Sequence, residues 1–203
     1  MEIKVCGIRR KEDVEIVNEY KPDYIGFVFA KSRRRVSAEE AAKLSAALAD
    51  GIKTVGVFVN ENPREVERIA KTAGLYAVQL HGDEDEDYIS RLNVNTEIWK
   101  AVRVRGGDIV TDVKGADRIL LDKYSEAEYG GGGKPFDWLG GLDIRAKAPI
   151  MLAGGLNARN VADGIRIFAP AGVDVSSGVE TDEYKDRDKI KEFIEKVRGE
   201  GTV

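Results

Sequence analysis

Short runs of β-branched and aromatic residues alternate along the chain with stretches in which apolar residues recur every three or four positions. The runs predict eight strands, at residues 3–5, 24–29, 54–59, 77–80, 98–102, 119–121, 149–152 and 172–175. The stretches predict helices at residues 11–20, 38–50, 63–73, 84–92, 138–146, 158–168 and 185–198, and a further one, with the weakest pattern, near 107–113. Strand and helix therefore alternate throughout.

This alternation is typical of a parallel sheet covered by helices. Two helix starts support it: Ser37 and Glu40 have the spacing of a capping box, and Asn62 precedes Pro63 at a first helical position. Eight strands without a break in composition favour closure into a barrel over an open doubly wound sheet. We therefore expect an α/β fold, a single (β/α)8 TIM barrel over residues 1–203.

Composition and charge narrow the class of function. The 203 residues carry 32 basic and 36 acidic side chains, a net charge of −4, with no basic stripe that would follow a nucleic acid. No apolar run approaches the roughly 18 residues of a membrane span, and the first residues show no signal-peptide pattern, so we expect a cytoplasmic protein. One cysteine rules out an internal disulfide, and one histidine argues against a multi-histidine zinc site, so no metal is expected.

Two glycine-bearing segments, each after a short apolar run, predict a phosphate site. They are Ala153-Gly154-Gly155-Leu156-Asn157 and Asp174-Val175-Ser176-Ser177-Gly178-Val179-Glu180. The loops after strands 7 and 8 of a (β/α)8 barrel present backbone N–H groups to phosphate, and glycine allows a close approach. Either segment alone would read as an ordinary strand-to-helix turn. As a pair they indicate a small phosphorylated substrate.

A third glycine-rich segment, Tyr129-Gly130-Gly131-Gly132-Gly133-Lys134, has a different interpretation. A Walker A motif needs glycine at the position of Glu128 and serine or threonine at that of Pro135, so ATP binding is excluded. The segment is either a mobile loop over the barrel mouth or a plain flexible linker.

Side-chain parity along the strands predicts which polar residues face the barrel interior. If Ile3 and Val5 face the helices, Lys4 and Cys6 point inward, with Cys6 at the carboxyl end of its strand. The same rule places three more ionisable groups at the carboxyl ends of strands: His81, Asp122 and Asp174. Active sites of this fold lie at that end, so these side chains are candidates for catalysis or substrate binding.

Each candidate also has a structural interpretation. A lone cysteine is often a buried hydrophobe, and His81 is either a wall of the site or a packed loop histidine. Asp122 is either a rim carboxylate or a cap or surface partner of Lys123, and Asp174 is expected to compensate the inward Lys4, because a buried lysine needs a partner. The basic run at residues 31–35 is either a solvated loop or, through one arginine, a binding site for an anionic group.

The motifs together resemble the phosphoribosylanthranilate isomerase family, over nearly the whole chain. They are Val5-Cys6-Gly7-Ile8, Gly26-Phe27-Val28-Phe29 with Lys31-Ser32, Gly56-Val57-Phe58-Val59-Asn60, Val78-Gln79-Leu80-His81-Gly82, Leu121-Asp122, Gly132-Gly133-Lys134 with Phe136-Asp137-Trp138, and the two phosphate segments. The chain departs from the family pattern at Arg35, where an aromatic residue is common, and at Glu183, where many members have glycine.

The resemblance implies an aldose–ketose isomerase of tryptophan biosynthesis that performs an Amadori rearrangement without a cofactor. It assigns the general acid to Asp122 and the general base to Cys6, and Lys4 is a candidate for lowering the pKa of that thiol. Arg34 would hold the anthranilate carboxylate and Asp174 would line the site. The phosphate would be held by Gly154, Gly155, Ser177 and Gly178. His81 is counted with the substrate-binding residues, and the protein is expected to be a monomer or a homodimer.

Two alternatives use the same phosphate loops. A ribulose-phosphate isomerase or decarboxylase on this scaffold would share them without the cysteine and aspartate placement. A non-catalytic phosphometabolite-binding subunit would keep Gly155 and Ser177 but would not need Cys6 or Asp122.

Overall fold

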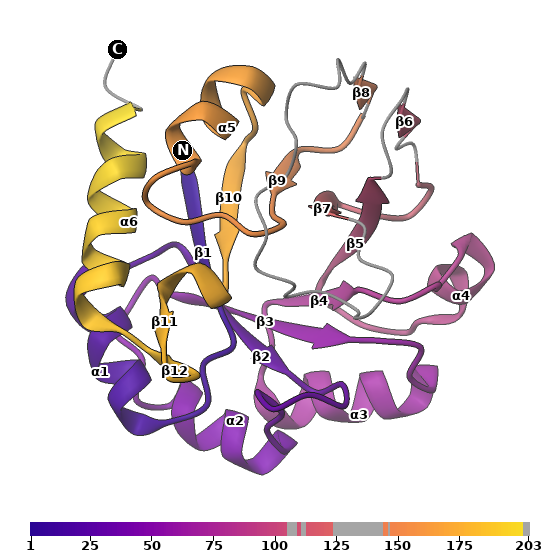
Figure 1. Cartoon of the computed structure of the whole chain (residues 1–203). Helices are drawn as coiled ribbons and strands as arrows, with labels where there is room; N and C mark the ends of the chain where they lie inside the picture. The colour runs from indigo at the N-terminus through magenta and orange to yellow at the C-terminus, as the bar shows by residue number, and fades with distance from the viewer. Residues whose placement is uncertain (105–108, 111–112, 124–143, 146, 201–203) are drawn as a thin grey trace.

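A closed barrel of eight parallel strands forms the centre of the molecule (Figure 1). The computed structural model describes residues 1–104, 109–110, 113–123, 144–145 and 147–200. Each barrel strand is hydrogen-bonded to the next in the order β1-β10-β9-β7-β5-β4-β3-β2. Their bounds are β1 Glu2–Cys6, β2 Tyr24–Val28, β3 Lys53–Phe58, β4 Ala77–Leu80, β5 Glu97–Val104, β7 Arg118–Lys123, β9 Ile150–Leu152 and β10 Gly172–Val175. The predicted barrel is therefore confirmed.

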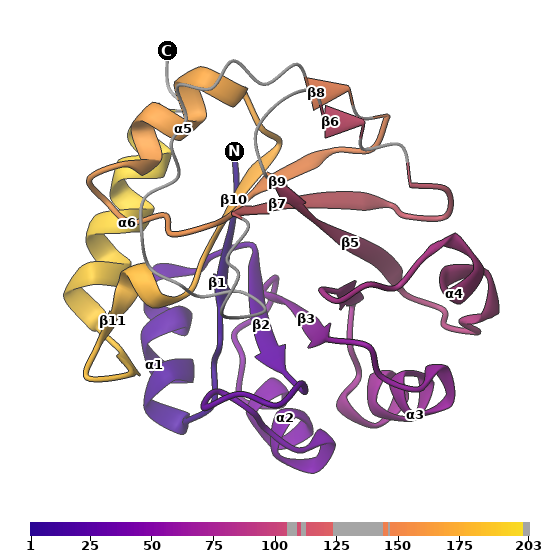
Figure 2. The same cartoon turned by 45° about the vertical axis from the view of Figure 1, so that its right-hand side comes forward.

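In the described part of the chain, six helices follow one another around the outside of the barrel (Figure 2). They are α1 Lys11–Tyr20, α2 Ala38–Ser45, α3 Pro63–Ala73, α4 Glu86–Arg91, α5 Val161–Phe168 and α6 Arg187–Glu200. The two predicted helix starts are confirmed, because Ser37 and Glu40 form a reciprocal capping box and Asn62 accepts a hydrogen bond from the Arg64 amide. None of the described helices combines the length and apolar character needed to cross a membrane.

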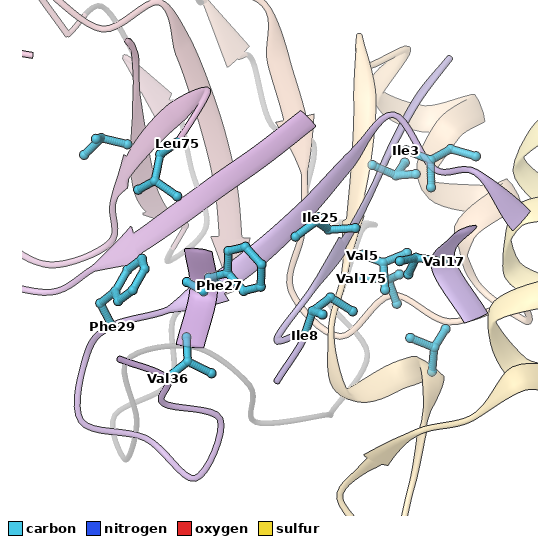
Figure 3. Close-up of a cluster of buried hydrophobic side chains, with 14 of the residues drawn as sticks. Ile3, Val5, Ile8, Val17, Ile25, Phe27, Phe29, Val36, Leu75 and Val175 are labelled. Carbon is cyan, nitrogen blue, oxygen red and sulfur yellow. The ribbon is translucent and has the colours of Figure 1, made fainter. Parts of the chain in front are cut away.

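Apolar side chains form two layers that follow the strand alternation. The inner cluster lies within the barrel and comprises Tyr24, Val55, Ala77, Trp99, Ala101, Leu120, Met151 and Ala153. The outer cluster lies between strands and helices; there Val5 of β1, Val17 of α1 and Val175 of β10 lie together (Figure 3). Burial of this outer layer supplies most of the driving force for folding, since it holds the larger number of aliphatic side chains.

The amino-terminal end of the barrel is closed by a charged and aromatic cluster. Arg118 forms an ion pair with Glu2 and lies 3.5 Å from Glu97. Glu97 also accepts a hydrogen bond of 2.8 Å from the Trp99 indole, and Tyr24 donates one of 2.9 Å to Glu2. These contacts fill the barrel at that end, so any substrate must enter at the carboxyl ends of the strands.

Several element boundaries differ from the predictions. Helix α2 ends at Ser45 instead of residue 50, and α5 begins at Val161 instead of residue 158. The weak helix predicted near 107–113 is wrong at Ile109–Val110. These two residues form strand β6, which pairs in parallel with β8, Ile144–Arg145. That pairing also contradicts the end of the helix predicted over 138–146. Three of these four paired residues are β-branched, which favours extended backbone. Val113 is not helical either, and residues 107–108, 111–112, 138–143 and 146 lie outside the described residues, as does the glycine-rich segment at 129–134.

The last predicted helix begins two residues late because a short antiparallel hairpin precedes it. Strands β11, Glu180–Thr181, and β12, Tyr184–Lys185, are joined by Asp182 and Glu183, whose φ angles are 48° and 69°. Both residues occupy the left-handed region that favours glycine. This geometry explains why a glycine is common at the position of Glu183 in the family that the sequence resembles.

Candidate active site

A cavity of about 440 Å³ opens at the carboxyl ends of the barrel strands. It brings together eight of the nine candidate residues: Cys6, Arg34, His81, Asp122, Gly154, Gly155, Asp174 and Ser177. The parity argument is thus confirmed for the three strand residues Cys6, Asp122 and Asp174. Gly178 does not line this cavity; it lines a second one of about 430 Å³ beside α6.

Cys6 ends strand β1 and is only 8% exposed. Its register partner on β2 is Gly26, and a Cβ atom at Gly26 would lie 2.6 Å from the Cys6 sulfur. A glycine at this position is therefore required to make room for the thiol. The sequence motif contained Gly26, but the packing reason for it appears only when the two strands are side by side.

Burial raises the pKa of the Cys6 thiol, while the positive charges of Lys4 and Lys185 act to lower it and the negative charge of Asp174 adds to the rise. Lys4 therefore acts in the predicted direction, but burial outweighs it. The expectation of a lowered pKa at Cys6 is wrong for the protein without substrate. The reason is that β1 places the sulfur below the rim and away from solvent.

Lys4 and Asp174 form the ion pair that parity predicted. They are register partners on β1 and β10, and Lys4 Nζ lies 3.0 Å from Asp174 Oδ2. Burial disfavours the ammonium form of Lys4, but Asp174 and Cys6 together outweigh it and the pKa of Lys4 is raised. The Asp174 side chain lines the cavity, and within the described part of the chain its Oδ1 is buried and accepts no hydrogen bond.

A hydrogen-bonded chain links Gln79, His81 and Asp122. Gln79 Nε2 lies 2.8 Å from His81 Nδ1, and His81 Nε2 lies 2.9 Å from Asp122 Oδ2. Because the amide nitrogen is a donor, it pairs with Nδ1 as acceptor and leaves the ring proton on Nε2, facing Asp122. Gln79 belongs to the sequence motif that contains His81, but the sequence assigned it no role.

Arg34 enters the cavity from the loop after β2, where its guanidinium binds a glutamate. Its Nε and Nη2 donate to the two carboxylate oxygens of Glu180 at 2.8 and 2.7 Å, the bidentate geometry that arginine favours. Gly7 makes room for it: φ is 87° there, and a Cβ would lie 2.6 Å from Arg34 Cδ. Glu180 was part of a recognised motif, but nothing in the sequence paired it with an arginine 146 residues away.

The two predicted phosphate loops lie side by side at the mouth. Gly154 and Gly155 follow β9 with φ angles of 90° and 78°, and Ser177 begins a 3₁₀ turn after β10. Gly178 allows these loops to meet, because a Cβ there would lie 1.9 Å from the Leu156 carbonyl oxygen. Gly178 is therefore a glycine that allows close packing beside the cavity. Its sequence motif did not distinguish this role from contact with the phosphate.

Among the residues that the structure describes, no group of three or more histidine, cysteine, aspartate or glutamate side chains has the proximity to hold a metal ion.

Comparison with known proteins agrees with this geometry. The family model described as N-(5'phosphoribosyl)anthranilate (PRA) isomerase matches residues 3–196. The chain is 50% identical over 203 residues to the N-(5'-phosphoribosyl)anthranilate isomerase of Thermoanaerobacter sp. (strain X514), with 98% of each chain covered. The crystal structure of phosphoribosyl anthranilate isomerase from Thermotoga maritima has a TM-score of 0.84 at 37% identity, covering 98% of this chain and 99% of that one.

A further solved structure contains a ligand. It is a phosphoribosyl anthranilate isomerase in complex with reduced 1-(o-carboxyphenylamino)-1-deoxyribulose 5-phosphate, with a TM-score of 0.79 and 34% identity over 98% of this chain and 99% of that one. Both the family model and the full-length relatives cover the strands and loops that form the cavity. The chain therefore belongs to the N-(5'-phosphoribosyl)anthranilate isomerase family.

Proposed function

We propose that this chain catalyses the Amadori rearrangement of N-(5-phosphoribosyl)anthranilate to 1-(2-carboxyphenylamino)-1-deoxyribulose 5-phosphate, a step of tryptophan biosynthesis, in the cavity at the carboxyl ends of its strands. One observation carries the proposal: Cys6 and Asp122, from separate strands, line one cavity with the loops after β9 and β10. Residues 1–203 form one catalytic domain that acts in the cytoplasm, as a monomer or a homodimer.

Asp122 is the general acid. It donates its proton to the ribose ring oxygen, the bond from C1 to that oxygen breaks, and the open chain carries a protonated imine at C1. The resulting Asp122 carboxylate accepts a hydrogen bond from His81 Nε2 at 2.9 Å, which stabilises the charge that the proton leaves behind.

Cys6 is the general base, as its thiolate. It removes the proton from C2, the electron pair forms a double bond between C1 and C2, and the enolamine then gains a proton at C1 and loses the hydroxyl proton at C2 to give the ketone. C1 is reduced and C2 is oxidised within one molecule, so the overall equation balances without an added oxidant, reductant or organic cofactor.

The cavity walls fit the two anionic ends of this substrate. Backbone N–H groups of the loops at Gly154, Gly155 and Ser177 hold the phosphate, and Arg34 holds the anthranilate carboxylate. The Asp174 carboxylate, which lines the cavity, accepts a hydrogen bond from a ribose hydroxyl. Gly178 contributes by letting the two phosphate loops pack together.

The test is turnover of freshly generated phosphoribosylanthranilate, followed by loss of its fluorescence. Wild type should be active, and Cys6→Ser and Asp122→Asn should each lose ~10²-fold or more in kcat with circular dichroism unchanged. Asp50→Asn, at an exposed residue of the α2–β3 connection, is the matched control and should keep full activity. A wild type that binds phosphosugars without turnover would favour the phosphometabolite-binding subunit, and turnover of ribulose phosphates instead would favour the other enzymes of this scaffold.

A further inference from the structure

Lys185 is a buried lysine that no step of the proposed reaction uses. It lies on β12, its side chain is 1% exposed, and its ammonium donates hydrogen bonds to the Ser176 carbonyl at 3.0 Å and to Glu180 Oε1 at 2.8 Å. A lysine buried to this degree is costly unless it is paired, and Glu180 provides the pair. Ser176 lines the cavity, so Lys185 contacts the cavity wall through this carbonyl.

Glu180 joins Lys185 to the arginine of the site. Its two oxygens accept both hydrogen bonds from Arg34 as well as the one from Lys185, and Arg33 lies 3.5 Å away. Burial opposes ionisation of Glu180, but these cations outweigh it and lower the pKa of Glu180 to about 2. The carboxylate is therefore charged at any working pH, and it holds the Arg34 guanidinium in one orientation.

Lys185 is also linked to Cys6 through Ser176. Ser176, whose carbonyl binds the Lys185 ammonium, donates its hydroxyl to the Cys6 carbonyl at 3.2 Å. Three charged groups act on the thiol: Lys4 of β1, Asp174 of β10 and Lys185 of β12. Asp174 neutralises Lys4 at 3.0 Å, whereas Glu180 shares its charge between Lys185 and Arg34, so Lys185 adds positive potential at the sulfur.

From these contacts we propose that Lys185 is a positioning residue for both halves of the site, fixing Arg34 through Glu180 and supporting the Cys6 thiolate with buried positive charge. The catalytic role of Lys185 rests on the proposed function, but its effect on the ionisation of the Cys6 thiol exists without substrate. If Lys185 only filled space, its replacement by a residue of similar volume would leave the ionisation of Cys6 unchanged.

The test is a pH titration of the Cys6 thiolate by its ultraviolet absorbance, with Cys6→Ser as the blank. Because the chain has one cysteine, the signal belongs to that thiol alone. Lys185→Met should move the titration to higher pH by about one unit, a tenfold loss of thiolate at neutral pH, while Lys185→Arg stays close to wild type. Lys189→Met is the matched control, since the exposed Lys189 ammonium donates to the Glu180 backbone carbonyl at 2.7 Å.

Glu180→Gln gives a second measurement, on the arginine half of the proposal. It removes the carboxylate that holds the Arg34 guanidinium, so KM for phosphoribosylanthranilate should rise about tenfold. If Lys185→Met does not fold, this variant decides. The proposal is overturned if Lys185→Met titrates like Lys189→Met, or if Glu180→Gln leaves KM unchanged. Shifts as expected in a protein without isomerase activity would instead overturn the proposed function alone.

Discussion

His81 Nε2 lies 2.9 Å from Asp122 Oδ2, and Gln79 holds the opposite ring nitrogen of His81 at 2.8 Å. The histidine thus directs an N–H group at the carboxyl group that acts as general acid, with its tautomer set by an amide on the same strand face. A general acid becomes a carboxylate when it gives up its proton. A hydrogen-bond donor that binds the carboxylate more strongly than the neutral acid therefore favours the proton transfer.

His81→Leu should therefore lower kcat about tenfold or more while KM changes little, because the histidine acts through Asp122. Steady-state kinetics on the purified variant measure both constants. Gln79→Leu, which releases the tautomer without touching Asp122, should give a smaller loss of the same kind. A rise in KM at constant kcat would show that His81 binds substrate instead.

Gly26→Ala should damage catalysis through sterics alone. The new methyl group would lie 2.6 Å from the Cys6 sulfur, so the thiol must move, and a displacement near 1 Å can lower kcat by ~10²-fold. Gly56→Ala is the matched control on the outer face of β3, where the methyl group would lie 2.4 Å from Leu75. Both should lose about 1–3 kcal/mol of stability in denaturant titrations, but only Gly26→Ala should lose activity.

The raised pKa of Cys6 predicts how activity depends on pH. Since the thiol carries its proton at neutral pH in the protein without substrate, kcat/KM should increase with pH until the thiol ionises. A pH profile of kcat/KM, taken with stable protein at each point, measures this limb. A flat profile through neutral and mildly alkaline pH would contradict Cys6 as the base.

Acid should destabilise the protein through Glu180. Its pKa is lowered from the 4.5 of a free glutamate to about 2, so its contribution is complete above pH 4.5 and is lost as pH falls toward 2. At 1.4 kcal/mol for each pH unit, that contribution is about 3 kcal/mol. Denaturant unfolding of wild type and Glu180→Gln at pH 6 and pH 3 should show a smaller loss in the variant. Equal losses would place the acid-sensitive group elsewhere.

Two exposed glycines should respond to alanine in opposite directions. Gly74 ends α3 with φ at 62°, and Gly199 lies within the last turn of α6; a Cβ at either would meet no atom within 4 Å. Gly74→Ala should cost about 1 kcal/mol from backbone strain, while Gly199→Ala should add up to about 1 kcal/mol from helix propensity. Thermal unfolding of the pair checks the signs, and a stabilised Gly74→Ala would contradict the left-handed cap.

The sequence predicted the barrel because its strand pattern repeats eight times, and parity then placed Cys6, Asp122 and Asp174 at one mouth. It missed contacts made by residues far apart in the chain, such as Arg34 with Glu180, because no local pattern encodes them. It also missed the direction of the Cys6 pKa, since burial is known only once neighbouring strands are in place. Short β-branched pairs such as Ile109–Val110 were mistaken for helix because two residues carry no measurable period.

The ion pair of Lys4 with Asp174 joins the first and last strands of the barrel, so it lies on the seam that closes the sheet. Cys6 stands on one side of this seam and Ser177 follows the strand on the other. Contacts so distant in sequence form late, because the entropy of closing a long loop must be overcome first. A chain still being synthesised would therefore carry its thiol but no phosphate loop after β10. Recovery of turnover during refolding should report barrel closure itself.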